Sequence, residues 1–190
     1  MVSRGMTMPY VALLYSITLG ARGRVRMADW REMMVSIGLR NPRTLIATGN
    51  AVFESEMASS QQLETLLEDA FASAFGRRVD TIVRTAERWR RLVGGNPFVD
   101  ESRCEGDRVA VRVMREPLGR DMAATLSPYA TQGERLDIVD GDLWIHFGDR
   151  PAQSKLLPVL TAKRLGVGTL RNWNTVRRID EMLDHSSPLT

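Results

Sequence analysis

Each half of the chain carries a two-residue turn signal between β-rich segments, and these two signals constrain the fold more than any other feature of the sequence. Glycine and asparagine tolerate the positive φ that a tight hairpin turn requires, and Asp-Gly is the stronger of the two signals. The turns and the strands that they are expected to join are Gly49–Asn50 between Thr44–Thr48 and Ala51–Glu54, and Asp140–Gly141 between Leu136–Val139 and Leu143–Phe147. The sequence therefore predicts two β-hairpins.

Periodic apolar residues around the first turn predict a strand, a helix, the hairpin, a second helix and a last strand, in that order. The strands are expected over Tyr10–Leu14 and Val79–Arg84, and the helices over Met27–Ile37 and Leu63–Phe75. Ser59, with Gln62 three residues later, predicts an N-cap for the second helix, and Gly76 predicts its end. This order is the split βαβ arrangement of a ferredoxin-like unit, an antiparallel sheet with helices on one face.

The second half repeats this order and adds a helix at its end. Its expected elements are a strand at Val109–Val113, a helix at Arg120–Leu126, the hairpin, a helix over about Ser154–Leu165, an extended segment at Val167–Leu170 and a helix over about Asn172–Leu183. We therefore predict an α+β protein of two tandem ferredoxin-like units, residues 1–84 and residues 107–190. Residues 85–106 are expected to form a connecting helix, capped by Thr85, and a loop. The halves share element order rather than matching residues, so a tandem duplication is an architectural inference.

The composition favours a globular protein of the cytoplasm. Hydrophobic residues make up 43% of the chain and charged residues 26%, as in an ordinary core under a charged surface. No apolar run approaches the roughly 18 to 20 residues that cross a bilayer, and Met1–Pro9 lacks the apolar stretch of a signal peptide. The single cysteine, Cys104, is expected in a polar loop and excludes an intramolecular disulfide. We expect no membrane partner.

The positive charge of the chain gives only weak support to a nucleic-acid partner. The net charge is +3, and nearly all of the cations are arginines, with lysine only at Lys155 and Lys163. Nucleic-acid binding needs clustered charge rather than a modest total, so a solvated surface is the commoner outcome. The glycine- and arginine-rich segment Gly20–Arg26 would suit a phosphate, but it lacks the spacing of a phosphate-binding loop and fits a solvated loop better.

Short motifs are spread over nearly the whole chain, from about Pro9 to Leu183. They are Tyr10–Leu14, Val25–Ala28, Gly38, Thr48–Phe53, Asn96–Phe98, Ser154–Leu156, Leu165–Val167 and Arg171–Val176. In this order and spacing they resemble the domain of unknown function 1697 family, which is found mainly in bacteria. The resemblance implies tandem ferredoxin-like units and carries no established activity. Tyr15 and Ser16 stand where members usually have an arginine and a glycine, which weakens the case for an anion site at that point.

Polar and cationic residues gather before two predicted helices of the second half and suggest a site for a small anion. They are Ser154, Lys155, Arg171, Asn172, Trp173, Asn174 and Thr175. Free backbone N–H groups at a helix start attract anions, so a phosphate or carboxylate, or a nucleic-acid phosphate, is the expected ligand. A structural interpretation competes with this one, because Asn172 or Asn174 would also cap a helix, Trp173 would pack on the core and Arg171 would pair with a surface carboxylate.

Two other functions remain open alongside a noncatalytic binding module. One is an enzyme of unknown class with a site between the two units, in which Asn50, next to Gly49, and Asn174 would orient a substrate. The other is a protein-interaction module. The only histidines are His146 and His185, and neither a catalytic triad nor a zinc site can be assembled from them, so no metal or cofactor is expected. His146 alternates with Trp144 along a predicted strand, and it is expected to lie at the edge of the sheet rather than to act in catalysis.

Overall fold

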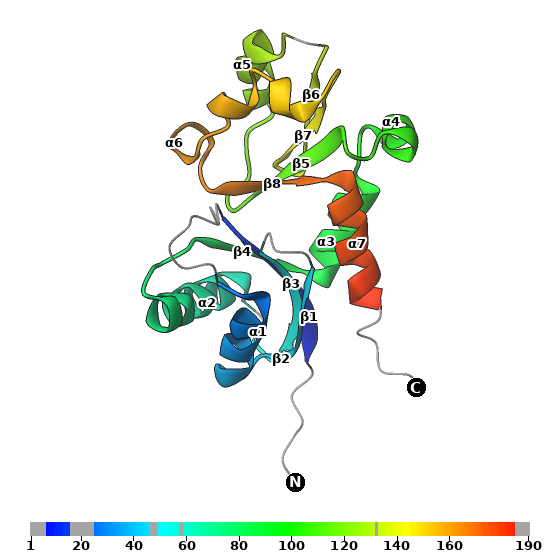
Figure 1. The fold of residues 1–190 in the computed structure, drawn as a ribbon. Coiled ribbons are helices and arrows are strands. Elements are labelled where there is room, and N and C mark those ends of the chain that lie inside the picture. Colours follow the sequence, from blue (N-terminus) through cyan, green and yellow to red (C-terminus); the bar gives the residue numbers. More distant parts are fainter. Residues whose placement is uncertain (1–6, 16–24, 46–48, 58, 132, 185–190) are drawn as a thin grey trace. The chain divides into compact units, whose positions relative to one another are not determined.

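The computed structural model describes residues 7–15, 25–45, 49–57, 59–131 and 133–184 (Figure 1). They form two units, of which the first contains the described residues of Met1–Arg90 and Arg178–Thr190 and the second is Arg91–Arg177. Each unit has one four-stranded antiparallel sheet together with helices, so the predicted α+β fold is confirmed. None of the described helices is long and apolar enough to cross a membrane.

The first unit has the element order that the sequence predicts. Its elements are β1 (Met8–Leu14), α1 (Met27–Ser36), β2 (Arg40–Leu45), β3 (Asn50–Ser55), α2 (Ser60–Phe75) and β4 (Thr81–Thr85). The strands lie in the order β2-β3-β1-β4, and α1 and α2 lie on the same face of this sheet (Figure 1). As predicted, the Ser59 side chain caps α2 by accepting a hydrogen bond from the Gln62 N–H, and Gly76 ends the helix with a φ of 70°.

The core of the first unit lies between the sheet and these two helices. Tyr10 and Phe53, on neighbouring strands, point into it and stack with ring centroids 5.6 Å apart. Trp30 of α1 and Phe71 of α2 are fully buried in the same cluster. Burial of apolar surface is the main favourable term in folding, so these contacts fix α1 through its inner face. The outer face of α1 can therefore carry polar side chains without loss of stability.

The first predicted hairpin is confirmed, although its turn is longer than the sequence suggests. β2 and β3 pair in antiparallel orientation, with Leu45 opposite Asn50. Asn50 is therefore part of β3 rather than of the turn, and its buried side-chain Nδ2 donates to the Leu45 carbonyl oxygen at 3.2 Å. Gly49 has a φ of 73°, which suits a turn glycine. Thr48 lies outside the described residues.

β2 is an irregular strand at the edge of the first sheet. It begins at Arg40 rather than at Thr44, where the sequence suggested, and its register shifts between Arg40 and Arg43. Asn41 has a positive φ of 49° inside this irregularity, and Pro42 follows it. Both residue types are disfavoured in regular strands, which is why the pattern of β-rich residues placed the strand too late.

β4, at the opposite edge of the sheet, is covered by two carboxylates of α2. Glu68 Oε1 accepts a hydrogen bond from the Thr81 N–H at 3.0 Å, and Glu64 Oε1 accepts one from the Val83 N–H at 2.9 Å. Both glutamates are buried, and Glu68 is also paired with Arg78 at 2.8 Å. Because the two N–H groups bond to the helix, they are not available to another strand.

The second unit repeats the strand order of the first. Its elements are α4 (Val99–Cys104), β5 (Val109–Met114), α5 (Met122–Leu126), η1 (Ser127–Tyr129), β6 (Arg135–Val139), β7 (Asp142–His146), η2 (Pro151–Gln153), η3 (Leu157–Val159), α6 (Ala162–Leu165) and β8 (Gly168–Asn172). The two boundaries between the units along the sequence fall within helices, one in α3 (Ala86–Gly94) and the other in α7 (Trp173–Asp184). The sheet order β6-β7-β5-β8 corresponds to β2-β3-β1-β4, as expected of two similar units. Thr85 caps α3, since its Oγ1 accepts from the Arg88 N–H at 3.2 Å.

Two predicted elements of the second unit are wrong. The helix expected over Ser154–Leu165 is instead two short 3₁₀ turns, η2 and η3, followed by the single-turn helix α6. Pro158 lies inside this segment, and a proline in a helix interior removes a hydrogen bond and clashes with the preceding turn. Cys104 is the last residue of α4 rather than part of a polar loop, although it is exposed.

The second predicted hairpin is confirmed at its turn. Asp140 and Gly141 both have positive φ, 50° and 84°, and Val139 pairs with Asp142 across them. Positive φ at both central residues is the backbone of the tight hairpin that Asp-Gly favours. The turn also packs closely against the chain before α5, because the Gly141 carbonyl oxygen accepts a hydrogen bond from the Leu118 N–H at 2.9 Å.

Candidate functional site

Two of the residues predicted to bind an anion at the start of α7 have local structural roles. Asn172 Oδ1 accepts a hydrogen bond from the Thr175 N–H at 3.0 Å, so it caps the helix. The Trp173 ring lies 6.0 Å from the Trp144 ring at an interplanar angle of 53°. Asn174 is exposed, and its Oδ1 lies so close to Gly106 that a Cβ there would be 2.5 Å away. The capping and packing interpretation therefore accounts for Asn172 and Trp173.

The Arg171 side chain is partly buried in the second unit rather than fully exposed at the start of α7. It lies at the end of β8, partly buried, and its Nη1 donates to Thr169 Oγ1 at 2.5 Å and to the Leu170 carbonyl oxygen at 2.9 Å. Burial lowers the pKa of Arg171 to about 10, so the guanidinium is still charged at neutral pH.

Ser154 and Lys155, two further predicted site residues of the second unit, differ in burial. Ser154 is buried and its Oγ donates to Glu134 Oε1 at 2.7 Å, whereas Lys155 is exposed. Gly49 and Asn50 belong to the first unit, while the other predicted residues lie in the second. The basic segment 20–24 and His185 lie outside the described residues.

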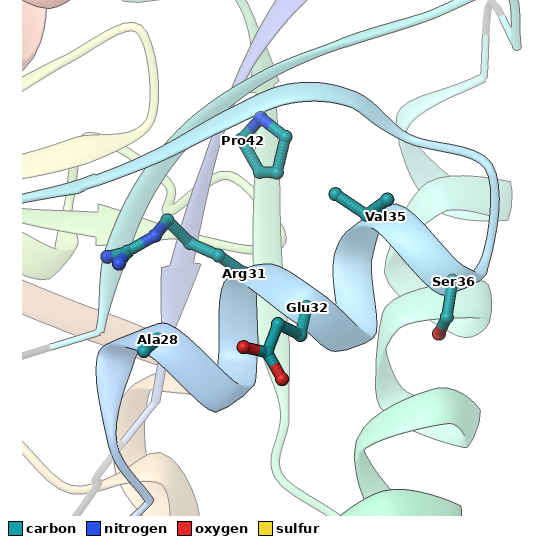
Figure 2. A pocket seen from close by; sticks show the side chains of 6 residues that line it. All are labelled: Ala28, Arg31, Glu32, Val35, Ser36 and Pro42. Atoms are coloured by element: carbon teal, nitrogen blue, oxygen red, sulfur yellow. The ribbon is translucent and has the colours of Figure 1, made fainter.

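A pocket on the first unit was not predicted from the sequence. It has a volume of about 450 Å³ and lies between α1 and β2 (Figure 2). Its lining residues are Ala28, Arg31, Glu32, Val35, Ser36 and Pro42. This volume falls within the range of roughly 300 to 1,000 Å³ that is typical of small-molecule sites.

The pocket forms where the outer face of α1 lies beside the irregular part of β2. The buried face of α1 points into the core and contains Trp30, Met33 and Met34. The helix residues that line the pocket lie on its other side. Val35 is left 58% exposed, a large apolar side chain at the surface. Pro42, in the irregular part of β2, completes the apolar floor. The signal for this site was therefore an apolar residue on the polar face of α1, next to a proline.

Arg31 is the cation of the pocket, and a hydroxyl group fixes it. Its Nη1 donates to Thr44 Oγ1 at 2.7 Å, which anchors the guanidinium against β2. Within the part of the chain that the structure describes, no carboxylate lies within ion-pair distance of Arg31. An arginine has five N–H donors in a planar fork, so the remaining donors can bind a carboxylate or phosphate.

A second pocket on the first unit is less suited to a charged ligand. It has a volume of about 260 Å³ and includes Arg40, Glu56 and Met57 in its lining. Arg40 Nη2 lies 3.0 Å from Glu56 Oε1, so its charge is already paired. Binding an anion there would require this ion pair to break.

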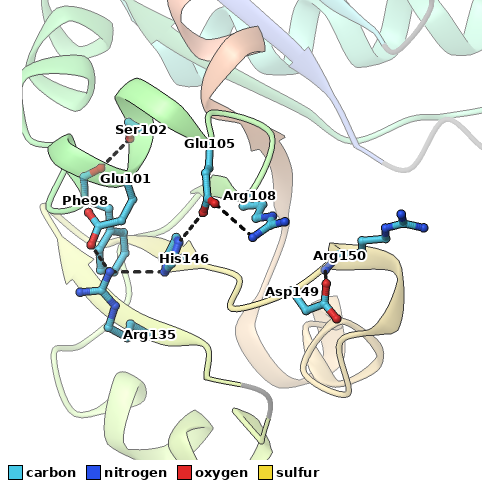
Figure 3. Close-up of polar contacts among 9 residues, drawn as sticks. All are labelled: Phe98, Glu101, Ser102, Glu105, Arg108, Arg135, His146, Asp149 and Arg150. Atoms are coloured by element: carbon cyan, nitrogen blue, oxygen red, sulfur yellow. Dashed lines mark hydrogen bonds and ion pairs between the residues drawn. The ribbon is translucent and has the colours of Figure 1, made fainter.

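The second unit contains a cluster of paired charges around His146 (Figure 3). Arg135 and His146 are cross-strand neighbours on β6 and β7, and Arg135 Nη2 lies 3.3 Å from His146 Nδ1. Arg135 also pairs with Glu101 of α4 and lies 5.2 Å above the Phe98 ring. Because arginine only donates, a hydrogen bond between these two atoms requires His146 Nδ1 to be the acceptor.

The same cluster continues to the end of α4. His146 Nε2 lies 3.6 Å from Glu105 Oε2, and Arg108 Nη1 lies 3.2 Å from Glu105 Oε1. These ion pairs and close contacts connect α4 to β6 and β7, although His146 Nε2 is buried and forms no hydrogen bond among the described residues. Among the described residues, no three histidine, cysteine or acidic side chains are grouped to hold a metal ion. His146 is the last residue of β7 and belongs to this cluster.

Removal of the Glu101 charge is expected to lower the stability of the second unit at neutral pH but not in acid. The hydrogen bond from Arg135 is the main cause that lowers the pKa of Glu101. A lowered carboxyl pKa contributes stability that is present above the pKa of the unfolded chain and is lost as the pH falls through the folded value. Glu101→Gln should therefore lower the melting temperature at pH 7, and the difference from wild type should disappear in acid.

A matched control for this prediction is Asp100→Asn. Asp100 is 91% exposed and lies 3.4 Å from Arg103, so its ion pair is expected to contribute little. Thermal melts of both variants from pH 7 to pH 3 test the prediction. An equal effect of Glu101→Gln at all pH values would show that the carboxylate charge is not the cause.

Comparisons with known proteins give a family and a fold. The family model described as "Protein of unknown function (DUF1697)" matches residues 7–144. Among solved structures, the chain is similar to the conserved bacterial protein SP0830 from Streptococcus pneumoniae, with a TM-score of 0.74 and 24% sequence identity, over 94% of this chain and 99% of that chain. At this identity the likeness shows the fold alone. No curated protein matches the chain.

Proposed function

The chain belongs to the DUF1697 family of proteins of unknown function, as its motifs predicted, and we propose that it is a noncatalytic module that binds a small anionic ligand. The ligand class is a carboxylate or a phosphate. The proposed location is the pocket between α1 and β2, with Arg31 as the residue that receives the anionic group.

The observation that carries this proposal is the anchored guanidinium of Arg31. Thr44 holds one of its nitrogens at 2.7 Å, which reduces the conformational entropy that the side chain would lose on binding. Charge-assisted hydrogen bonds from arginine are about twice as strong as neutral ones. The neighbouring Val35 and Pro42 supply apolar surface for the body of the ligand.

A second location has a specific observation in its favour, and it keeps the site suggested by the sequence. Lys155 is exposed and Arg171, in the same unit, is desolvated enough to lower its pKa to about 10. An anion that reached Arg171 would gain from that desolvation. A phosphate group of a nucleic acid could bind at this second location through the same charged contacts.

The cytoplasm is the proposed compartment. Cys104 is a free and exposed thiol. Exposed unpaired thiols persist in reducing compartments, whereas secreted proteins tend to pair them.

Loss of binding in Arg31→Met is the expected result that tests the proposal. The probes are inorganic phosphate and 4-methylpentanoate, a small carboxylate with an apolar tail, titrated into the full chain and followed by NMR chemical shifts. At least one probe should bind, and Arg31→Met should weaken it about tenfold or more, because a hydrogen bond to a charged group is worth about 1.5 to 3 kcal/mol.

Two further variants serve as controls for the location. Arg40→Met removes an exposed arginine of the same unit that is already paired with Glu56, so it should leave binding unchanged. Lys155→Met tests the alternative site in the second unit. A loss of binding that follows Lys155 and not Arg31 would overturn the location between α1 and β2, and no binding of either probe would overturn the ligand class.

A further inference from the structure

We infer that the ligand of the pocket between α1 and β2 is a zwitterion with an apolar body, in chemical terms an apolar α-amino acid. This inference rests on the proposed function and adds a second charged contact to it. In this arrangement Arg31 binds the carboxylate, Glu32 binds the ammonium group, and the apolar side chain lies on Val35 and Pro42.

The first step of the argument is that the pocket carries two opposite charges. Arg31 and Glu32 are consecutive residues of α1, and both line the pocket (Figure 2). Consecutive helix positions diverge by about 100° around the axis and do not face each other. Among the described residues, no ion pair joins Arg31 to Glu32. The Glu32 carboxylate interacts electrostatically with Arg26, whose pKa it helps to raise, but it forms no ion pair with that arginine.

The second step is that a carboxylate ligand that also carries an ammonium group would make a favourable contact with each of the two charges. Glu32 is exposed, and its charge would repel a second negative charge in the pocket. An ammonium group attached one carbon away from the carboxylate converts this repulsion into attraction. The electrostatics of the pocket therefore favour a ligand with both charges over one with a carboxylate alone.

The third step is that the rest of the pocket is apolar. Ala28, Val35 and Pro42 offer methyl and ring carbons, and Val35 is 58% exposed in the structure. Ser36 adds little polarity, because its Oγ already donates to the Met33 carbonyl oxygen at 2.7 Å. A volume of about 450 Å³ is enough for a branched aliphatic side chain next to the two charged groups.

The experiment compares L-leucine with 4-methylpentanoate, which is the same molecule without the amino group. Both are titrated by NMR into the full chain at low ionic strength, where exposed charges are least screened. In wild type, leucine is expected to bind about fivefold more tightly, as expected for an exposed ion pair worth up to about 1 kcal/mol. In Glu32→Gln, this preference should disappear or reverse, while the melting temperature stays unchanged because Glu32 is exposed.

The outcomes separate this inference from the proposed function. If 4-methylpentanoate binds wild type as tightly as leucine or more tightly, the inference of a zwitterionic ligand is wrong. The proposed binding of an anionic group is still supported in that case if Arg31→Met abolishes binding. A preference for leucine that survives in Glu32→Gln would also overturn the inference, since Glu32 would not be the partner of the ammonium group. If neither compound nor phosphate binds, the proposed function fails as well.

Discussion

Gly141→Ala is expected to destabilise the second unit by about 2 to 5 kcal/mol. Gly141 has a φ of 84°, a conformation that costs an L-residue about 1 to 2 kcal/mol. A Cβ at this position would also lie 2.4 Å from Pro117 Cβ and 2.7 Å from Pro117 Cα. The second of these atoms is backbone and cannot move aside cheaply, so overpacking adds roughly 1 to 3 kcal/mol.

Gly133→Ala is the matched control, because it separates the backbone effect from the clash. Gly133 lies in the same unit and has a φ of 75°, but among the described residues an added Cβ would meet only Gly148 Cα, at 3.9 Å. We expect a loss of about 1 to 2 kcal/mol from the positive φ alone. Urea unfolding followed by circular dichroism measures both variants. Equal losses in the two would mean that the turn does not pack against Pro117 as described.

Trp30→Ala is expected to cost about 3 to 5 kcal/mol and to abolish ligand binding. Trp30 is the largest side chain that α1 contributes to the core of the first unit, and it is fully buried. Truncation of a buried aromatic residue removes its transfer free energy and leaves a cavity. The indole Nε1 has no hydrogen-bond partner among the described residues, so the whole loss comes from packing. The proposed site on the outer face of α1 depends on this anchor.

Val35→Ala on the same helix is the control for stability. Val35 is 58% exposed, so its truncation should change the free energy of unfolding by no more than about 0.5 kcal/mol. Trp30→Phe provides an intermediate case, because it keeps an aromatic ring and removes the unpaired N–H. If Trp30→Ala unfolded at the same urea concentration as Val35→Ala, the inner face of α1 would not anchor the helix as described.

Most elements of the fold could be predicted from local sequence signals, because the tertiary structure keeps the turns and helix caps that these signals indicate. The two turn glycines, Gly49 and Gly141, both have the positive φ that their positions demand. Ser59 and Thr85 cap the helices they were expected to cap. Failures came where one residue type outweighed the periodicity, as Pro158 did in the helix expected over Ser154–Leu165.

The candidate site was harder to predict than the fold, because it depends on which groups are already satisfied. Asn172 and Ser154 have ligand-binding side chains, but the structure uses them to cap a helix and to bind a buried carboxylate. Sequence alone gives no register between α1 and β2, so the approach of Arg31 to Thr44 could not be deduced. The irregularity at Pro42, which opens the pocket, was also invisible to a pattern of strand residues.

The covered edge of the first sheet decides how this protein can meet other chains. Sheets commonly recruit a peptide, or a second copy of themselves, by adding a strand along a free edge. At β4 that route is closed, since Glu64 and Glu68 already occupy the outward Thr81 and Val83 N–H groups. Pro42 and the shifted register make β2 a poor template as well. Recognition by the first unit must therefore work through side chains, and the same arrangement protects it against fibre growth by sheet extension.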